Sequence, residues 1–304
     1  MGRYDTTTPR EASTTEGPLV SVVVATYNRS DLLRKNLDAV LDQDFGGYEA
    51  VYVDDSSTDD TPAVLAEYEA RFSDRLRVLR VPNGGQGRAR NAGAQTARGE
   101  LLLITDDDTV PPPNWISAMV ANFRRHECDA LSGGFAPVSM ETPVERYLYF
   151  RECILCGDRP KYARVVPAMS LLVPRKLFWE IGGFIAEPIE DWVFCRQLRE
   201  AGKRLYYDPS VRVAHHYQSE WAQAAKRMHT PAVRGINDRL DRGKSGWPYI
   251  AYSAGKWITS PLWSLWRYPL DLWFLSIRME TVFFTARLRA YAVALRGDRV
   301  QAQH

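Results

Sequence analysis

Residues 101–115 read LLLITDDDTVPPPNW, an apolar run that ends in three consecutive aspartates and is followed by three prolines. Adjacent carboxylates repel and raise one another's pKa unless a cation lies between them. Mg²⁺ and Mn²⁺ prefer oxygen ligands and complete their coordination with water and the phosphates of a substrate. The stretch therefore predicts a strand that presents Asp106, Asp107 and Asp108 to a metal and a nucleotide diphosphate. A solvated acidic turn capped by prolines is the alternative.

The composition is typical of a globular protein. The chain has 304 residues, 45% of them hydrophobic, and a formal net charge of +2, so it can bury a large core and its bulk charge indicates neither disorder nor nucleic-acid binding. Four cysteines in this length do not form a disulfide framework and fit a reduced, cytosolic setting. Cys153 and Cys156 form one C-x-x-C without the second pair of a zinc site. Residues 1–17 lack an apolar run, so we expect a flexible tail without a secretory signal.

Strand-like and helix-like patterns alternate through the first hundred residues. Each β-branched or apolar run is followed by a polar loop and a helical pattern, which predicts an α/β fold with a doubly wound, mostly parallel sheet flanked by helices. The expected strands are 19–25, 50–53, 77–81 and 101–104, with helices after the first, second and third. In such sheets ligands bind outside the carboxyl ends of the strands.

Polar residues gather at those predicted strand ends, which favours a ligand site over a solvated turn. The residues are Thr26, Tyr27, Asn28 and Arg29 after the first strand, Asp54 and Asp55 after the second, and the triplet after the fourth. Neither a G-x-G-x-x-G nor a Walker A motif is present, so the nucleotide is held in another way. Gly84, Gly85 and Gly87 permit a sharp turn or a close backbone approach to a ligand. Arg88 and Arg90 then face either phosphate or solvent.

Four motifs, in this order, resemble the nucleotide-binding half of the family 2 glycosyltransferases: VSVVVATYNR, VYVDDSSTDDT, GRARNAG and LLITDDDTVPPPNW. The likeness continues through residues 182–184 and the pair Glu190 and Asp191 to about His216. The resemblance implies the GT-A fold. It also implies that Thr26, Tyr27, Asp54 and Asp55 hold the nucleoside, and that Asp106 and Asp108 bind a metal on the donor diphosphate with Asp107 between them.

The pair Glu190 and Asp191 begins a helical pattern, where negative charge is also favoured by the helix dipole. By resemblance, Asp191 is the general base, with Glu190 beside it. A sugar hydroxyl is a poor nucleophile and needs such a base, and a metal that stabilises the leaving diphosphate replaces an acid, so we expect inversion. His215 and His216 end a predicted strand at 211–214, and one of them resembles an additional metal ligand or phosphate contact. Their side chains alternate in direction, so at most one faces the site.

We expect four parts: the tail (1–17), a nucleotide-sugar-binding half (18–112), an acceptor and catalytic-base half (113–222) and a helical, aromatic-rich C-terminal extension (223–304). The longest uncharged run of its aromatic segment, residues 257–266, is too short to span a membrane, which takes about 20 apolar residues. Interleaved aromatic and arginine residues suit helices that lie on a membrane. They equally suit packing on the catalytic domain or on a second copy in a homodimer.

The sequence thus predicts a metal-dependent inverting glycosyltransferase that uses Mn²⁺ or Mg²⁺ and a UDP- or GDP-sugar. The acceptor is expected to be a glycan or lipid-linked glycan, in the cytoplasm or on the cytoplasmic face of a membrane. A haloacid-dehalogenase-like phosphotransferase is one alternative, because Asp106, Asp108 and Val110 fit D-x-D-x-[TV], although that family's aspartates follow its first strand. A non-catalytic nucleotide-sugar-binding protein is the other.

Overall fold

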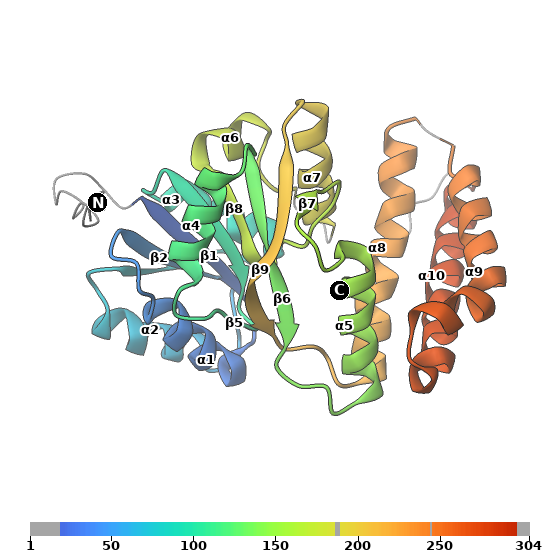
Figure 1. Cartoon of the computed structure of the whole chain (residues 1–304), viewed down its shortest axis with the longest axis horizontal. Helices are drawn as coiled ribbons and strands as arrows, with labels where there is room; N and C mark the ends of the chain where they lie inside the picture. The colour runs from blue at the N-terminus through green and yellow to red at the C-terminus, as the bar shows by residue number, and fades with distance from the viewer. Residues whose placement is uncertain (1–18, 186–188, 244, 297–304) are drawn as a thin grey trace, which may run out of the picture.

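The computed structural model describes residues 19–185, 189–243 and 245–296, and it consists of a mixed sheet flanked by helices with a group of C-terminal helices on one side (Figure 1). The expected tail, residues 1–17, lies outside the described residues. The strands are β1 (Val20–Thr26), β2 (Tyr48–Asp54), β3 (Leu76–Arg80), β4 (Leu101–Asp106), β5 (Thr109–Val110), β6 (Ala130–Pro137), β7 (Lys161–Tyr162), β8 (Leu171–Pro174) and β9 (Leu205–His215).

Helices connect and cover these strands. They are α1 (Ser30–Leu41), α2 (Thr61–Arg71), α3 (Gln86–Thr96), α4 (Trp115–Arg125), α5 (Pro143–Cys156), α6 (Arg175–Glu180), α7 (Glu190–Glu200), α8 (Trp221–Asp241), α9 (Trp247–Arg267) and α10 (Trp273–Ala294), with the short 3₁₀ helices η1 (Ala168–Ser170) and η2 (Leu270–Leu272). No helix in the described ranges is long and apolar enough to cross a membrane.

The parallel half of the sheet confirms the predicted α/β class. Strands β3, β2, β1 and β4 lie side by side and parallel, and all seven residues of both β1 and β2 are buried. Apolar runs of this kind are typical of parallel strands covered on both faces. Ala25 is in register with Asp106, and Thr26 with Asp54, so the polar residues that follow β1, β2 and β4 meet at one edge.

The other half of the sheet is mixed, and it brings a late strand back to the acidic triplet. Strand β8 runs antiparallel between β4 and β6, while β9 is parallel to β6 and antiparallel to both β5 and β7. In the β5–β9 pair, Thr109 is the partner of His215. A residue more than one hundred positions downstream therefore lies against the turn that carries the aspartates.

Two large hydrophobic clusters organise the described residues, and a smaller third one joins β1 and β2 to α3. The largest contains buried residues of β1, β2, β3, β4, β6, β8 and β9 and so joins the two predicted halves. The second contains Tyr147 and Leu148 of α5 together with α8, α9 and α10, so the C-terminal helices pack on α5 as well as on one another. The predicted boundaries at 112 and 222 remain predictions.

The contact of α3 with the sheet generates a stability prediction. A methyl group on Gly93 would lie 2.6 Å from Val23 Cγ1 and 3.0 Å from Val53 Cγ2, whereas one on Gly255 of α9 would meet nothing within 4 Å. We expect Gly93→Ala to overpack the core and reduce the free energy of unfolding by about 1–3 kcal/mol. Gly255→Ala should instead increase it by about 0.5–1 kcal/mol through helix propensity. Urea unfolding of both variants checks this, and a stable Gly93→Ala protein would contradict it.

Candidate active site

Arg90 connects the two halves of the predicted site. It extends from α3 and is 2% exposed. Its Nη2 donates to Asp106 at the end of β4, and its Nη1 donates to Oε1 of Glu190 at the start of α7 over 2.8 Å. We expected Arg90 to face either phosphate or solvent. In the structure it instead bonds to two carboxylates. The guanidinium therefore fixes the acidic strand end to the helix that carries Asp191.

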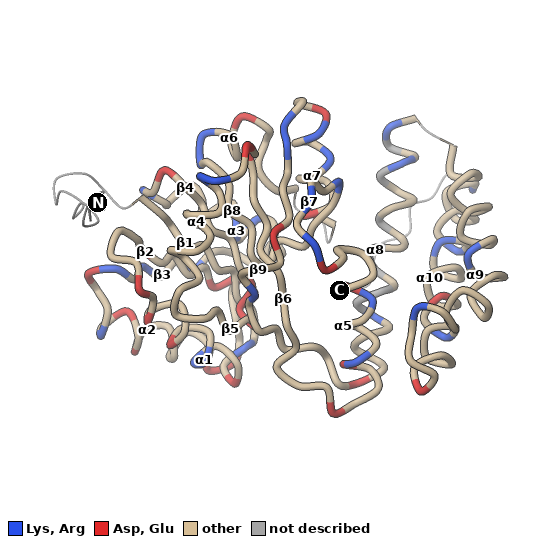
Figure 2. The backbone as a smooth tube through the Cα atoms, in the orientation of Figure 1, with Lys and Arg blue, Asp and Glu red and all other residues tan. Residues whose placement is uncertain are grey.

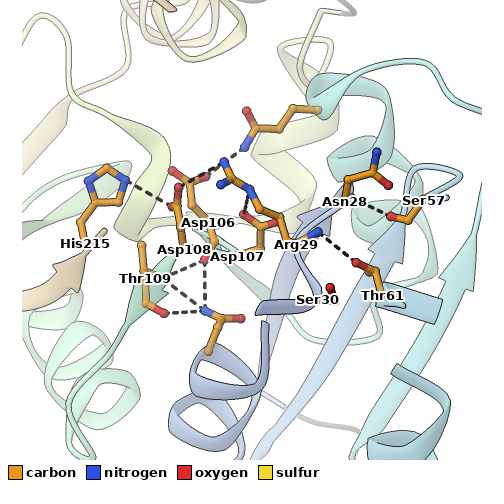
Figure 3. A network of polar contacts seen from close by, with 12 residues as sticks. Asn28, Arg29, Ser30, Ser57, Thr61, Asp106, Asp107, Asp108, Thr109 and His215 are labelled. Atoms are coloured by element: carbon orange, nitrogen blue, oxygen red, sulfur yellow. Dashed lines mark hydrogen bonds and ion pairs between the residues drawn. The ribbon is translucent and has the colours of Figure 1, made fainter. Parts of the chain in front are cut away.

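The three aspartates turn to different partners. Asp106 also accepts a hydrogen bond from Gln86 Nε2 at 3.1 Å. Arg29 lies over the other two, with Nε 3.8 Å from Asp107 Oδ1 and Nη2 3.6 Å from Asp108 Oδ2. Figure 3 shows Arg29 beside this pair and His215 on the far side of Asp108. The triplet is thus divided between a bridging arginine, a loop arginine and a histidine.

Asp106, Asp108 and His215 form a cluster suited to a divalent cation. One ligand atom from each lies within 4.8 Å of the others, and His215 Nε2 is 3.2 Å from Asp108 Oδ1. His215 is fully buried and Asp108 is nearly so. Two carboxylates and one imidazole fit an oxygen-rich Mn²⁺ or Mg²⁺ site that leaves positions for substrate phosphates and water. The residues present therefore fit the predicted metal.

The neighbouring histidine has a different environment. His216 is half-buried, and its backbone N–H donates to the carbonyl of Asp108 over 2.9 Å. Burial, followed by the positive charge of Lys35, lowers the pKa of its imidazole. Only His215 of the pair belongs to the cluster with Asp106 and Asp108.

The pKa of Asp107 reflects its burial and the repulsion between neighbouring carboxylates. Burial, followed by the charge of Asp108, raises the pKa of the Asp107 carboxyl to about 7, while Arg29 and the hydroxyl of Thr26 act in the opposite direction. Like charges at this spacing favour protonation of one carboxyl. A cation near Asp108 would reduce this repulsion and favour the ionised form of Asp107.

A buried amide that was not identified as functional from the sequence holds the backbone of the triplet through hydrogen bonds. Asn36 lies on the apolar face of α1, and its Nδ2 donates to the carbonyls of Asp106 (3.1 Å) and Thr109 (2.8 Å). The hydroxyl of Tyr52 in turn donates to Asn36 Oδ1 over 2.7 Å. The signal for this role was an asparagine among the leucines of an amphipathic helix, because a buried amide must find partners.

The loop after β1 lies beside the triplet. Thr26 is buried, Tyr27 is 46% exposed, and Asn28 has the left-handed φ of 52°. The backbone N–H of Asn28 donates to Ser57 Oγ (2.9 Å), and its side-chain oxygen accepts from the backbone N–H of Thr58 (2.8 Å). The exposed Tyr27 ring and the Arg29 guanidinium are therefore presented by a loop tied to the one that follows β2.

The aspartates after β2 already have partners within the chain. Asp54 accepts from Ser57 N (2.8 Å) and pairs with Arg80 (3.0 Å). Asp55 accepts from the backbone N–H groups of Gly84 (2.9 Å) and Gly85 (2.8 Å). Both carboxylates organise loops at the strand edge, and their predicted contact with the nucleoside remains a prediction.

The glycines before α3 meet a geometric need. Gly85 has φ +86°, and a methyl group on Gly87 would lie 2.0 Å from the carbonyl oxygen of Ile185. The chain that leads to α7 can therefore approach α3 closely only because residue 87 has no side chain. Arg88, one residue further, is exposed at the start of α3.

The acidic pair at the start of α7 is divided between two tasks. Glu190 is buried and bonded to Arg90, whereas Asp191 is partly exposed and its Oδ1 accepts from the backbone N–H of Trp192 (2.8 Å). The partial burial of Asp191, followed by the negative charge of Glu190, raises the pKa of its carboxyl to about 7. A carboxyl with a pKa near the working pH can accept a proton from a substrate.

Comparison with known proteins adds a family-level likeness. The model of Glycosyl transferase family 2 matches residues 21–175. The putative teichuronic acid biosynthesis glycosyltransferase TuaG of Bacillus subtilis is 26% identical over 161 residues, which are 52% of this chain and 63% of that protein. The chain therefore spans less than two thirds of the length of this relative.

Two solved structures share the fold. The mannosyltransferase PcManGT from Pyrobaculum calidifontis, in complex with GDP-Man and Mn²⁺, has a TM-score of 0.61 and 21% identity, with 95% of this chain and 78% of that chain covered. S. aureus TarS 1-349 in complex with UDP-GlcNAc has a TM-score of 0.56 and 16% identity, with 93% of each chain covered. At these identities the likeness extends to the fold alone.

The buried Arg90 bridge predicts a large stability effect. Arg90→Met leaves the buried Glu190 and the partly buried Asp106 without their cation, so we expect the free energy of unfolding to fall by about 3–5 kcal/mol. Arg90→Lys keeps the charge but cannot bond both carboxylates with a planar fork, and should give an intermediate loss. Urea unfolding without metal measures both.

Arg34→Met is the matched control, because Arg34 forms an exposed ion pair with Glu67 at 2.8 Å. Its replacement should leave the free energy of unfolding nearly unchanged. An Arg90→Met protein with the urea midpoint of the Arg34→Met protein would contradict the bridging role.

Proposed function

This chain belongs to Glycosyl transferase family 2, and from that premise we propose that it transfers a sugar from a nucleotide diphosphate sugar to an acceptor hydroxyl. The observation that carries the proposal is the cluster of Asp106, Asp108 and His215 at the carboxyl edge of the sheet, linked through Arg90 to the helix of Asp191. An acidic metal-binding group and a carboxylate of raised pKa are what this reaction requires.

Donor binding is assigned to the edge formed by the loops after β1, β2 and β4. Asp106, Asp108 and His215 would hold Mn²⁺ or Mg²⁺, which when bound neutralises charge on the diphosphate leaving group. Asp107 and Arg29 lie next to this cluster and are suited to hold the nucleoside side of the donor. The donor is a UDP- or GDP-sugar, in keeping with the ligands named for TarS and PcManGT.

Asp191 is assigned the role of general base. The acceptor oxygen forms a bond to the anomeric carbon as the bond from that carbon to the diphosphate oxygen breaks, and the hydroxyl proton passes to Asp191. Glu190 is engaged by Arg90 and acts as a positioning residue for Asp191. Attack from the side opposite the leaving diphosphate inverts the anomeric configuration. The acceptor is proposed to be a glycan or lipid-linked glycan.

The alternatives fare differently. The haloacid-dehalogenase-like reading does not fit, because the aspartates follow the fourth strand of a family 2 chain and because Asp106 is bonded to Arg90 and Gln86. A non-catalytic nucleotide-sugar-binding protein would keep the donor site and lack transfer, so the variants of Asp191 described below distinguish it.

The two adjacent histidines allow a matched test of the metal site. His215→Gln should weaken Mn²⁺ binding by at least roughly 10- to 100-fold, because it removes a nitrogen ligand itself and loss of a group that only orients a ligand already costs that much. His216→Gln should change Mn²⁺ affinity by less than about twofold, as its imidazole lies outside the cluster. Titration of Mn²⁺ followed by electron paramagnetic resonance measures both. Equal effects of the two variants would refute the assignment of His215.

The raised pKa of Asp191 predicts how activity depends on pH. The basic form dominates above a pH of about 7, so kcat should rise with pH through about 7 and then level off. Asp191→Asn should lower kcat by about 10²- to 10⁴-fold and leave donor affinity unchanged. Transfer at an unchanged rate in Asp191→Asn would remove this residue from the mechanism.

A stability measurement shows separately whether the carboxyl is perturbed. A carboxyl whose pKa is higher in the folded than in the unfolded chain binds its proton more tightly when folded, so protonation of Asp191 favours the folded state. That contribution to the free energy of unfolding is lost as the pH rises through about 7 and the carboxyl ionises. Without metal, Asp191→Asn should therefore unfold at a higher temperature than the parent at pH 8. That difference should shrink toward pH 5.

A further inference from the structure

The outer side of α9 is an apolar surface that no other described part of the chain covers. Trp266 is 92% exposed, Leu262 71% and Ile258 68%. Leu270 (78%) and Phe274 (75%) continue this exposure through η2 into α10. We refer to these five side chains, with Trp247 and Leu265, as the α9 face. Monomeric proteins rarely expose a contiguous apolar surface of this kind without a partner.

Helix geometry places the α9 members of this face on one side. At 3.6 residues per turn, Trp247, Ile258, Leu262 and Leu265 fall within about 60° of one another, and Trp266 borders them. The two charged residues of α9, Lys256 and Arg267, fall on a different side of the helix. The outward stripe of α9 is therefore apolar and aromatic along its whole length.

The charge of the C-terminal helices is mainly basic. Residues 247–296 contain six basic and two acidic residues. Both acidic residues are paired within the chain: Asp271 with Arg146 (2.8 Å) and Glu280 with Lys256 (3.7 Å). Arg267, Arg289 and Arg296 are exposed, and Figure 2 shows blue more often than red along α9 and α10. The C-terminal helices that carry the α9 face therefore have an excess of exposed positive charge.

We propose that the α9 face docks on the surface of a membrane that contains anionic lipid. An apolar and aromatic stripe on helices with an excess of basic residues is suited to lie in the plane of a lipid interface, with tryptophan at headgroup depth and arginine near acidic headgroups. The helices are not apolar enough to cross a membrane in the described chain, so they lie on it. A second copy is the weaker occupant, because a two-fold contact would bring together two sets of helices that both carry excess positive charge.

Figure 1 places α9 and α10 on the side of the molecule away from β1 to β4, beyond α8 and α5. The face can therefore bind lipid while the strand edge that carries the aspartates remains open. Docking does not depend on the proposed transfer reaction. Taken with that proposal, it favours an acceptor that is itself anchored in the membrane.

Cosedimentation with vesicles tests the proposal on the full chain. The parent should sediment with vesicles of phosphatidylcholine mixed with phosphatidylglycerol, and less with phosphatidylcholine alone or at high salt. The double variant Leu262→Ser with Trp266→Ser should bind the mixed vesicles roughly tenfold or more weakly. Arg289→Gln with Arg296→Gln should reduce the dependence on anionic lipid and salt.

The matched control is Met140→Ser with Leu155→Ser, which removes two exposed apolar side chains outside the face and should bind vesicles like the parent. Thermal unfolding confirms that each variant is folded. Failure of the parent to bind mixed vesicles, or equal binding by Leu262→Ser with Trp266→Ser, overturns the proposal. So does a dimer in sedimentation velocity that this variant abolishes, since it would assign the face to a second copy. Donor binding is unaffected in every case.

Discussion

The buried guanidinium of Arg90, held between Asp106 and Glu190, is the interaction on which the candidate site depends. Burial acts to lower the pKa of Arg90, but the charges of Asp106 and Glu190 outweigh it and raise that pKa. A buried charge of this kind persists only when it is fully paired. The pairing joins α3 to a helix that begins one hundred residues further along the sequence, and it sets the position of Asp191 relative to the acidic strand end.

Because Arg90 engages Asp106, the three aspartates of the triplet have different partners. Asp106 is engaged by Arg90, Asp107 faces Arg29, and Asp108 faces His215. Three adjacent carboxylates would otherwise share one environment and repel one another. Gly87 makes the arrangement sterically feasible, because any side chain there would meet the carbonyl of Ile185. The small residue, the buried arginine and the acidic strand end thus form one unit.

Much of the fold was predictable from local patterns. The strands near 19–25, 50–53, 77–81 and 101–104 were found where the β-branched runs indicated, and their shared edge follows from the parallel order. The antiparallel position of β8 between β4 and β6 and the pairing of β5 with β9 could not be predicted. The register between strands that are distant in the sequence leaves no local signal. Those pairings decide that the imidazole of His215, rather than that of His216, lies against the carboxylate of Asp108.

The site was predictable in its acidic members and not in their supports. Asp106 to Asp108 stand out because consecutive like charges at a strand end are strained. Asn36 and Gln86 stand in helical patterns where polar residues are common, so their sequence context does not indicate a role in the site. Only the tertiary structure reveals that both donate hydrogen bonds to Asp106. Arg90 was recognised as chemically relevant, but the carboxylate that competes with phosphate for it, Glu190, arrives from the other half of the chain.

Calorimetric titration of UDP- and GDP-sugars, with and without Mn²⁺, tests the central claim most directly. The account predicts that at least one donor binds in the presence of Mn²⁺ and that binding is lost when the metal is removed with a chelator. It also predicts that Asp108→Asn abolishes the metal-dependent part of the signal. An unchanged signal across the whole donor panel with Mn²⁺ present, or donor binding indifferent to both the metal and Asp108, would contradict it.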